Sequence, residues 1–197
     1  MSLPSFEELL QESVRIHGHL CPGQVLGVRL AMLGLRLVGI DDPKGEQRKD
    51  LLVFVEIDRC ATDAIQSVTG CSLGKRSLKF MDFGIMAATF WNTSAGKAVR
   101  IVAKEESKEG SAKYFPEIEN KYKRQVEAYK VMSDHELFEV QEVELKQLPD
   151  CDLPGRPTRR VQCDMCGDWV QDCRDVELDG KVVCRACAGQ RYYTRRN

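Results

Sequence analysis

The placement of the cysteines constrains this 197-residue chain more than any other feature of its sequence. Their number, nine, is odd, and six of them fall in residues 151–197, against three in the first 150 residues. The opening segment MSLPSFEELLQES is acidic and has no apolar stretch, so we expect no secretion signal and a cytoplasmic location. Because cytoplasmic thiols stay reduced, these cysteines are expected to be metal ligands or catalytic groups rather than a disulfide framework.

Two Cys-x-x-Cys pairs near the C-terminus give the strongest local signal. The first pair is Cys163 and Cys166, the second is Cys184 and Cys187, and 17 residues lie between the pairs. Four thiolates at this spacing suit a tetrahedral zinc ion, with Zn–S bonds of about 2.3 Å. A segment of about 45 residues with few large apolar groups cannot form a sufficient apolar core and needs a structural metal ion to fold. The alternative interpretation is four reduced thiols without a metal.

The residues around the two pairs predict a treble-clef zinc finger. Gly167 suits a knuckle turn that points backbone amides at the sulfurs. We expect a hairpin between residues 169–170 and 181–183, with Asp179-Gly180 at its turn, and a terminal helix that begins in the segment AGQRYY. Knuckle, hairpin and helix together make up the treble-clef arrangement.

The surface of the predicted finger has two interpretations. Arginines beside two tyrosines can contact nucleic acid. They are Arg156, Arg159, Arg160, Arg185, Arg191, Arg195 and Arg196, beside Tyr192 and Tyr193. Acidic residues are interleaved with them, which favours a structural or protein-binding module. Cys151 and Cys173 lie outside the two pairs and are interpreted as partly buried or incidental thiols.

Composition and charge limit the classes of partner. The chain has 29 basic and 30 acidic residues and a formal net charge of −1, which argues against coating nucleic acid or an anionic membrane. Its most apolar stretch, residues 25–40, contains Arg29 and Arg36 and is too short to span a membrane. A proline-rich linker separates two domains. We therefore expect a core at 1–148, a linker at 149–160 and a finger at 161–197.

Hydrophobic periodicity and turn residues predict a mixture of helices and strands in the core. Ser5 and Glu8 form a capping-box pattern ahead of an apolar stripe, and Gly39 ends a second, mostly apolar helix. We expect helices at 5–16, 24–38, 61–68 and 116–132, strands at 51–57, 77–83, 89–92, 98–103 and 137–145, and a charged turn or loop at 104–110. Helices and strands do not alternate strictly, so the predicted class is α+β.

The segment HGHLCPG concentrates ligand-type side chains between two predicted helices. It places His17 and His19 next to Cys21, which would lie at a helix N-terminus, where the dipole favours thiolate. Imidazole and thiolate at this spacing are ligands for zinc or a related transition metal. Cys60 has a parallel setting, because it follows a predicted buried strand and opens a helix. The alternative for each residue alone is an ordinary core or surface side chain.

Further side chains surround this predicted pocket. Cys71 lies in a glycine-containing loop with Lys75, which can fix an anionic ligand or a thiolate, although the spacing is not that of a phosphate-binding P-loop. Asp58 and Asp63 are nearby acids that can orient an imidazole by accepting a hydrogen bond from the ring nitrogen that does not bind the metal. His135 has no such context and is interpreted as structural.

Two blocks of sequence resemble the family of formylmethanofuran dehydrogenase E-subunit proteins. They are HGHLCPGQVLGVR and DRCATDAIQSVTGCSLGKRSLKFMDFGIMAATF, within a match over about residues 5–145. The resemblance implies an α+β core, a homodimer and a metal pocket. The predicted finger resembles an auxiliary domain that some members carry. The pocket residues implied by the resemblance are His17, His19, Cys21 and Cys60, with Cys71 and Lys75 beside them.

The resemblance places the chain beside a molybdenum or tungsten enzyme that reduces carbon dioxide onto methanofuran in methanogenesis. With 197 residues and no ferredoxin-like cysteine run, the chain is expected to be an accessory subunit with zinc in the finger and zinc or another transition metal in the core. A second hypothesis is a stand-alone enzyme, with Cys60, Cys21 or a metal-activated water as the reactive group. A third, less favoured, is a zinc-finger regulator that binds nucleic acid or protein.

Overall fold

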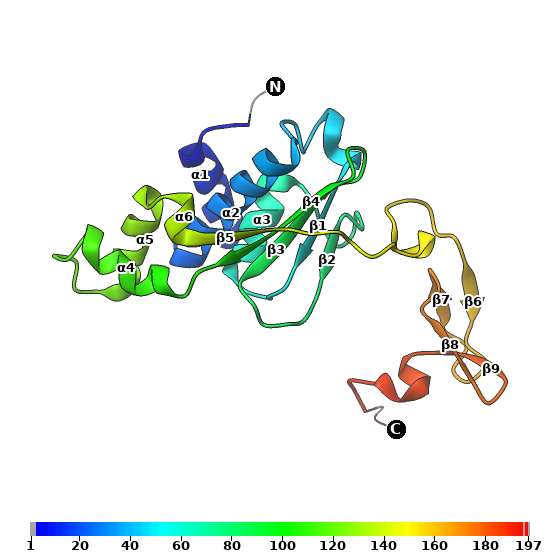
Figure 1. The fold of residues 1–197 in the computed structure, drawn as a ribbon. Helices are drawn as coiled ribbons and strands as arrows, with labels where there is room; N and C mark the ends of the chain where they lie inside the picture. The colour runs from blue at the N-terminus through cyan, green and yellow to red at the C-terminus, as the bar shows by residue number, and fades with distance from the viewer. Residues whose placement is uncertain (1–2, 195, 197) are drawn as a thin grey trace. The chain divides into compact units, whose positions relative to one another are not determined.

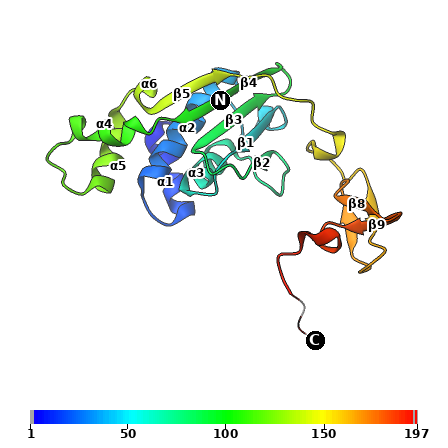
Figure 2. The same cartoon turned by 60° about the horizontal axis from the view of Figure 1, so that its bottom comes forward.

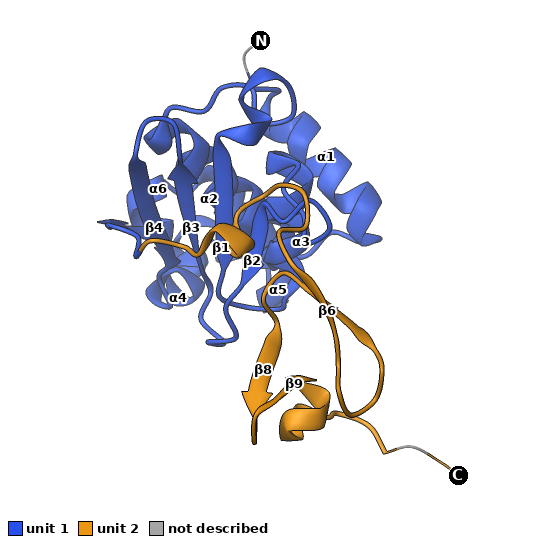
Figure 3. Cartoon of the chain, turned by 90° about the vertical axis from the view of Figure 1, so that its right-hand side faces the viewer, with its two compact units in different colours: residues 1–146 blue, residues 147–197 orange. Residues whose placement is uncertain are grey.

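A computed structural model describes residues 3–194 and 196, and its internal contacts divide the chain into two compact units, residues 1–146 and 147–197 (Figure 3). The first unit combines a sheet with helices, so the mixed α and β content expected from the sequence is confirmed. Among the described residues, none of the helices has the length and apolar character needed to cross a membrane. Each unit is described separately below.

A five-stranded sheet in the order β2-β1-β3-β4-β5 forms the first unit (Figure 1). Its strands are β1 (Leu51–Val55), β2 (Leu78–Phe80), β3 (Ala87–Asn92), β4 (Lys97–Ala103) and β5 (Phe138–Glu142). The β1–β2 pair is parallel and the other pairs are antiparallel. Val53 lies opposite both Leu78 and Phe90, and all three side chains are buried. A short 3-10 helix, η1 (Glu46–Lys49), leads into β1.

Three helices pack on one another on one face of this sheet, and the central one lies against its strands (Figure 2). They are α1 (Phe6–His17), α2 (Pro22–Val38) and α3 (Cys60–Thr69). The expected capping box of Ser5 and Glu8 starts α1, and the expected break at Gly39 ends α2 in a left-handed conformation. The central helix α2 contacts α1, α3, β3 and β4, which explains why it is apolar around most of its circumference.

Glycine at position 27 sets the distance between α2 and α3. A Cβ atom at Gly27 would lie 2.6 Å from the carbonyl oxygen of Ala61 and 2.7 Å from the Cβ of Ala64, well inside van der Waals contact. At Gly23, one turn earlier, a Cβ would lie 3.0 Å from the Cβ of Cys60. The absence of side chains at these positions therefore lets the N-terminal turns of α2 and α3 lie against each other.

The region after β4 corrects two expectations. Residues 104–110 were expected as a charged loop, but α4 (Glu106–Tyr114) begins within them. Its buried residues are Ser107 and Ser111, so it has no large apolar stripe for a sequence pattern to detect. The helix expected at 116–132 is shorter, α5 (Lys121–Val131), because the side chain of Asn120 caps it by accepting hydrogen bonds from two backbone amides.

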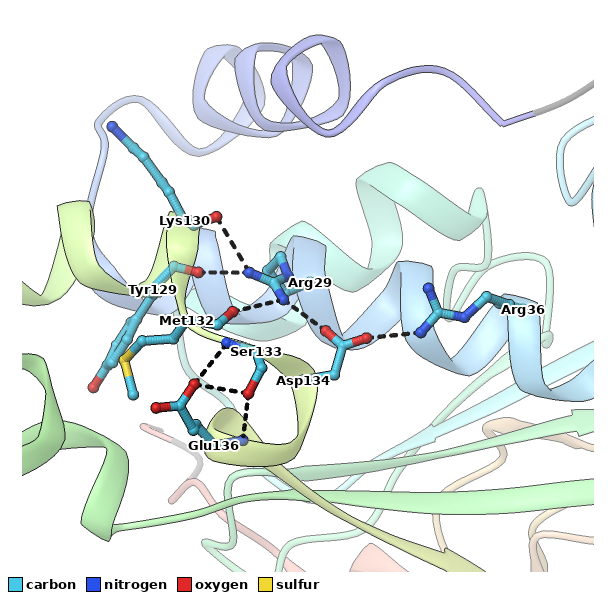
Figure 4. A network of polar contacts seen from close by, with 8 residues as sticks. All are labelled: Arg29, Arg36, Tyr129, Lys130, Met132, Ser133, Asp134 and Glu136. Carbon is cyan, nitrogen blue, oxygen red and sulfur yellow. Dashed lines mark hydrogen bonds and ion pairs between the residues drawn. The ribbon is translucent and has the colours of Figure 1, made fainter. Parts of the chain in front are cut away.

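The short helix α6 (Asp134–Leu137) joins α5 to β5 and is held to α2 by ion pairs (Figure 4). The guanidinium of Arg29 donates to the backbone carbonyls of Tyr129 and Met132, at 2.9 and 3.0 Å, and thereby binds the end of α5. Arg29 and Arg36 each donate to one oxygen of Asp134, at 2.7 Å. The three helices are therefore connected by one polar network.

The second unit consists of short strands around the two cysteine pairs. Its elements are η2 (Asp150–Asp152), β6 (Arg160–Gln162), β7 (Trp169–Gln171), β8 (Asp175–Leu178), β9 (Lys181–Cys184) and η3 (Ala186–Gln190). The strand β6 pairs with β7, and β8 pairs with β9. The terminal helix expected from AGQRYY is a single turn, η3, in which Gly189 is left-handed.

The expected hairpin around Asp179-Gly180 has a different first strand. The turn is where the sequence places it, with φ of 50° at Asp179 and 73° at Gly180. Its strands are β8 and β9, however, whereas Trp169 lies in β7 and pairs with Gln162. A two-residue turn joins strands that are adjacent in sequence, so the partner of β9 has to end at residue 178.

Candidate metal centres

Three helix ends bring the predicted ligands of the core together. His17 is the last residue of α1, Cys21 is the N-cap of α2, and Cys60 is the first residue of α3. Gly18 ends α1 with φ of 97°, and its amide donates to the carbonyl of Val14 at 2.8 Å. Pro22 then starts α2 in its first turn. The tight connection between the two helices therefore holds the HGHLC segment beside α3.

His17 is oriented by a carboxylate and has one buried nitrogen left over. Its Nδ1 atom lies 2.8 Å from Oδ2 of Asp63, in the first turn of α3, so the expectation that Asp63 orients an imidazole is confirmed. Only 13% of the His17 side chain is exposed. Its Nε2 atom is buried and has no hydrogen-bond partner within the described part of the chain. A histidine held at Nδ1 by a carboxylate presents the lone pair of Nε2, as metal-ligating histidines do.

Two more ligand-type side chains lie beside His17. The rings of His17 and His19 have their centroids 4.6 Å apart. One ligand atom from each of His17, His19 and Cys21 lies within 4.8 Å of the others. Nitrogen and sulfur donors in this number fit zinc and related transition metals. The donor set and the unpaired Nε2 therefore fit the metal that the sequence predicts.

Cys60 lies next to this group through its contact with Cys21. Burial raises the pKa of the Cys60 thiol, and the hydrogen bond that its S–H donates to Cys21 and the negative charge of Cys21 raise it further. The space above Gly23 opens onto both sulfur-bearing side chains, with the Cys21 Sγ 3.8 Å from the position of an added Cβ. A cation between the two sulfurs would reverse the effect of Cys21, because it favours the thiolate form of both.

A buried glutamine that the sequence did not single out ties the three helices together. Gln24 is fully buried in α2, where its Oε1 accepts a hydrogen bond from the hydroxyl of Ser13 in α1. Its Nε2 donates to the backbone carbonyl of Cys60, at 2.5 Å. Both polar ends of the amide are therefore used to fix Cys60 relative to α1 and α2. The one signal in the sequence for this role is that Gln24 is a polar residue within a mostly apolar segment.

Cys71 and Lys75 are not brought to the cluster. They follow the C-terminal end of α3, whereas Cys60 begins it, and ten residues of helix span about 15 Å. Cys71 is 4% exposed and lies in the apolar core, where burial raises the pKa of its thiol. The amine of Lys75 donates to the carbonyl of Gly70, at 2.9 Å, at the end of α3. Both side chains have structural contacts in these positions.

The second unit brings its four paired cysteines to one point. Ligand atoms of Cys163, Cys166, Cys184 and Cys187 all lie within 4.8 Å of one another. The sulfurs of Cys166 and Cys184 are 3.8 Å apart. Backbone amides also point at sulfur, because Cys184 N–H donates to Cys163 Sγ at 3.2 Å and Cys187 N–H donates to Cys184 Sγ at 3.4 Å. This arrangement is compatible with a zinc finger.

The thiols of this group differ in acidity. The backbone amide of Cys184 lowers the pKa of Cys163 to about 6. The amide of Asp168 also lowers the pKa of Cys166, but desolvation and the neighbouring thiols Cys163 and Cys187 raise it, to about 12. Cys163 can thus bind a cation as thiolate, and the other cysteines lose their thiol protons when a cation binds.

Several arginines of the second unit have partners within it. Arg160 lies over the ring of Trp169, with its guanidinium carbon 4.6 Å from the ring centroid. Arg159 pairs with Asp175 at 2.9 Å, and Arg174 pairs with Asp152. Part of the basic character noted in the sequence is therefore used inside the unit.

Comparison with known proteins gives the chain a family. Residues 16–150 match the family model described as FmdE, molybdenum formylmethanofuran dehydrogenase operon. The crystal structure of an FmdE-like protein of tungsten formylmethanofuran dehydrogenase from Syntrophus aciditrophicus has a similar fold, with a TM-score of 0.65 and 20% identity. The similarity covers 98% of this chain and 100% of that one.

A curated relative extends the similarity in sequence. It is a probable S-adenosyl-L-methionine-binding protein of Archaeoglobus fulgidus, 29% identical over 202 residues, which cover 93% of this chain and 53% of the relative. The chain thus spans about half the length of this relative. Since the family model matches more than half of the chain, including His17, His19, Cys21 and Cys60, the chain belongs to the FmdE family.

Proposed function

We propose that this chain is a metal-binding accessory protein of formylmethanofuran dehydrogenase chemistry, with one transition metal in the core and one zinc ion in the finger. The observation that carries the proposal is the buried Nε2 of His17, which lacks a partner among the described residues while Asp63 holds Nδ1. A buried polar atom without a hydrogen bond is costly, and a metal ion would satisfy it.

The core metal would be held by His17, His19, Cys21 and Cys60. The first three already gather their ligand atoms, and Cys60 adjoins Cys21. Once bound, a transition metal would act as a Lewis acid at this point, with the thiolates as its soft ligands. Asp63 orients His17, and Gln24 positions Cys60, each through a hydrogen bond. In the finger, zinc would be held by Cys163, Cys166, Cys184 and Cys187, and would serve as the staple that its short strands require.

The partner would be a component of the molybdenum or tungsten enzyme, and the chain itself would form a homodimer. The family description supports the first part, because it names the operon of the molybdenum enzyme. Exposed apolar side chains at the end of the edge strand β2 and just after it support a protein-binding surface. They are Phe80, Met81, Phe83 and Ile85. The amide of Ile85 donates to the carbonyl of Glu56 at 3.1 Å, so this segment runs beside the chain that leads to Cys60.

Elemental analysis of protein purified without added metal tests the metal proposal. We expect two equivalents of metal per chain in the wild type, one in His17→Ala and one in the double variant Cys163→Ser/Cys166→Ser. The matched control is His135→Ala, because His135 is an exposed histidine of α6 outside both groups. A single equivalent in the wild type that the cysteine double variant abolishes would refute the core site.

Sedimentation analysis and co-purification test the partners. We expect the wild type to sediment as a dimer and Phe83→Asp, which places a charge on the exposed apolar segment, to lose either the dimer or binding to the purified molybdenum or tungsten enzyme. A monomeric wild type that does not bind the enzyme would refute the partner proposal and leave the metal proposal standing.

A stand-alone enzyme is the second candidate. The favouring observation is that His17, His19 and Cys21 form a group of three, while Cys60 is adjacent to it, so a fourth position can remain open. Catalytic zinc sites have three protein ligands and one exchangeable position. X-ray absorption on the Cys163→Ser/Cys166→Ser variant distinguishes the two. One sulfur per core metal favours an open site, and two sulfurs favour a closed one.

A further inference from the structure

Cys151 and Cys173 are a second pair of thiols in residues 147–197, separate from the four clustered cysteines. Cys151 lies in η2, and Cys173 lies in the turn between β7 and β8. Although 22 positions separate them in sequence, the two thiols lie close enough that the hydrogen-bonding and negative charge of Cys173 raise the pKa of Cys151. Cys173 is exposed and Cys151 is half-buried, so small solutes can reach the pair.

The backbone around the two residues is fixed by contacts that do not involve sulfur. Arg174, next to Cys173, donates to the carbonyl of Cys151 at 3.3 Å and pairs with the carboxylate of Asp152. The amide of Asp172 donates to the carbonyl of Arg159 at 2.9 Å. These contacts hold η2 against the turn, and the proximity of the two thiols follows from this arrangement.

The conformation of the turn gives independent support. Asp172 and Cys173 have φ of 54° and 56°, the left-handed region that residues with a side chain avoid. Asparagine or glycine would occupy position 173 with less strain. A cysteine there gains nothing from its backbone conformation, and its interaction with Cys151 is what distinguishes it from those residues.

We propose that Cys151 and Cys173 are a redox-active dithiol that forms a reversible disulfide with a low-molecular-weight disulfide such as oxidised glutathione as oxidant. The disulfide would close a loop that contains β6, Cys163, Cys166 and β7, and so would tie the linker to the first zinc knuckle whether or not zinc is bound. The loop would constrain the unfolded chain over about 20 residues.

The reaction is a two-step exchange. The thiolate of Cys173 attacks one sulfur of the oxidant, forms a mixed disulfide and releases one small thiolate. The sulfur of Cys151 then attacks the sulfur of Cys173 and releases the second small thiolate. The protein loses two electrons and two protons, and the oxidant gains them as two thiols. Because the Cys151 S–H donates to the sulfur of Cys173, the pKa of Cys151 is raised, which fits Cys151 as the second, resolving thiol.

Mass spectrometry of the zinc-loaded full-length chain tests the proposal. After incubation with oxidised glutathione, we expect the wild type to lose the mass of two hydrogen atoms, to retain its zinc and to regain the mass with a reductant. Cys151→Ser and Cys173→Ser should each abolish this change. Cleavage by trypsin after Arg159 or Arg160 should slow by roughly tenfold or more in the oxidised wild type only.

Two results would overturn the proposal. One is glutathione bound separately to Cys151 or Cys173 in the wild type without an internal disulfide. The other is an internal disulfide that persists in both serine variants or that forms only as zinc leaves, since it would then belong to the four paired cysteines. Zinc content, measured on the same samples, confirms that each serine variant retains its folded finger.

Discussion

The Nδ1 atom of His17 lies 2.8 Å from Oδ2 of Asp63, so a carboxylate in the first turn of α3 orients a histidine at the end of α1. The contact spans 46 positions of sequence. It fixes the ring and leaves the buried Nε2 without a partner in the described part of the chain, while His19 and Cys21 each place a ligand atom within 4.8 Å of a ring nitrogen of His17. The two helices thus orient a histidine that we propose as a metal ligand, and this orientation is the basis of the first prediction.

Asp63→Asn should weaken metal binding in the core without affecting the finger. The amide is a poorer acceptor for Nδ1–H, and loss of such a partner costs about 10- to 100-fold in metal affinity. Competition with a chromophoric chelator measures the affinity of each metal. Asp58→Asn is the matched control, because Asp58 is an exposed acid five positions earlier. Equal affinities for Asp63→Asn and wild type would contradict the role of Asp63.

Gly27→Ala should destabilise the first unit by about 1–3 kcal/mol, because the added methyl forces α2 away from α3. The shift should also separate Cys21 from Cys60 and weaken the core metal. Denaturant titration measures the free energy of unfolding. Gly74→Ala is the control, since a Cβ there meets no atom of the described chain within 4 Å and its φ is not in the left-handed region. Similar losses in both variants would refute the close-approach argument.

Acid should destabilise the first unit through the capping box of α6. A hydrogen bond from Tyr114, together with those from Ser133, lowers the pKa of Glu136 from 4.5 to about 2. A lowered folded-state pKa gives stability that is complete above pH 4.5 and is lost as the pH falls toward 2. Asp134 adds to the same trend: burial raises its pKa, but Arg29 and Arg36 lower it more.

The variant Glu136→Gln isolates this effect, because glutamine can still cap the helix but carries no titrating charge. We expect its unfolding midpoint to depend less on pH between about 4.5 and 2 than that of the wild type. Glu117→Gln, which changes an exposed glutamate, should keep the wild-type dependence. If Glu136→Gln and Glu117→Gln behave alike, the contact with Tyr114 does not stabilise the fold.

Removal of metal should unfold residues 147–197 and spare residues 1–146. Residues 147–197 have short strands around four clustered sulfurs and are expected to need a metal ion to fold, whereas the first unit has a large apolar core. The two tryptophans report separately, since Trp91 is in β3 and Trp169 is in β7. We expect a strong chelator to change the near-ultraviolet circular dichroism of Trp91→Phe and to leave that of Trp169→Phe nearly unchanged. The reverse pattern would contradict the assignment.

The first three helices were predictable because their ends have strong local signals. Ser5 with Glu8 starts α1, and Gly39 and Gly70 end α2 and α3 in left-handed conformations. By contrast, α4 was missed because Ser107 and Ser111 form its buried side, and small polar residues leave no periodic apolar pattern. The partner of β9 is not the expected segment 169–170, because a two-residue turn at Asp179-Gly180 joins β9 to the strand that ends at residue 178.

The candidate site was predictable only where its residues are close in sequence or have ligand chemistry. His17, His19 and Cys21 lie within five residues, and their side chains suggest a metal. Gln24 was not found, because its role depends on Ser13 and Cys60, which only the packing of three helices brings to it. The loop context and the family resemblance place Cys71 beside the pocket, but the length of α3 separates it from Cys60.

The most direct test of the central claim is the anomalous scattering of crystals of metal-loaded protein, measured on both sides of the zinc absorption edge. We predict two peaks per chain if both sites take zinc, one among Cys163, Cys166, Cys184 and Cys187, and one in contact with Nε2 of His17. A core metal other than zinc would give its peak at that metal's own edge. A single peak in the finger, with no metal of any kind beside His17, would contradict the proposed core site.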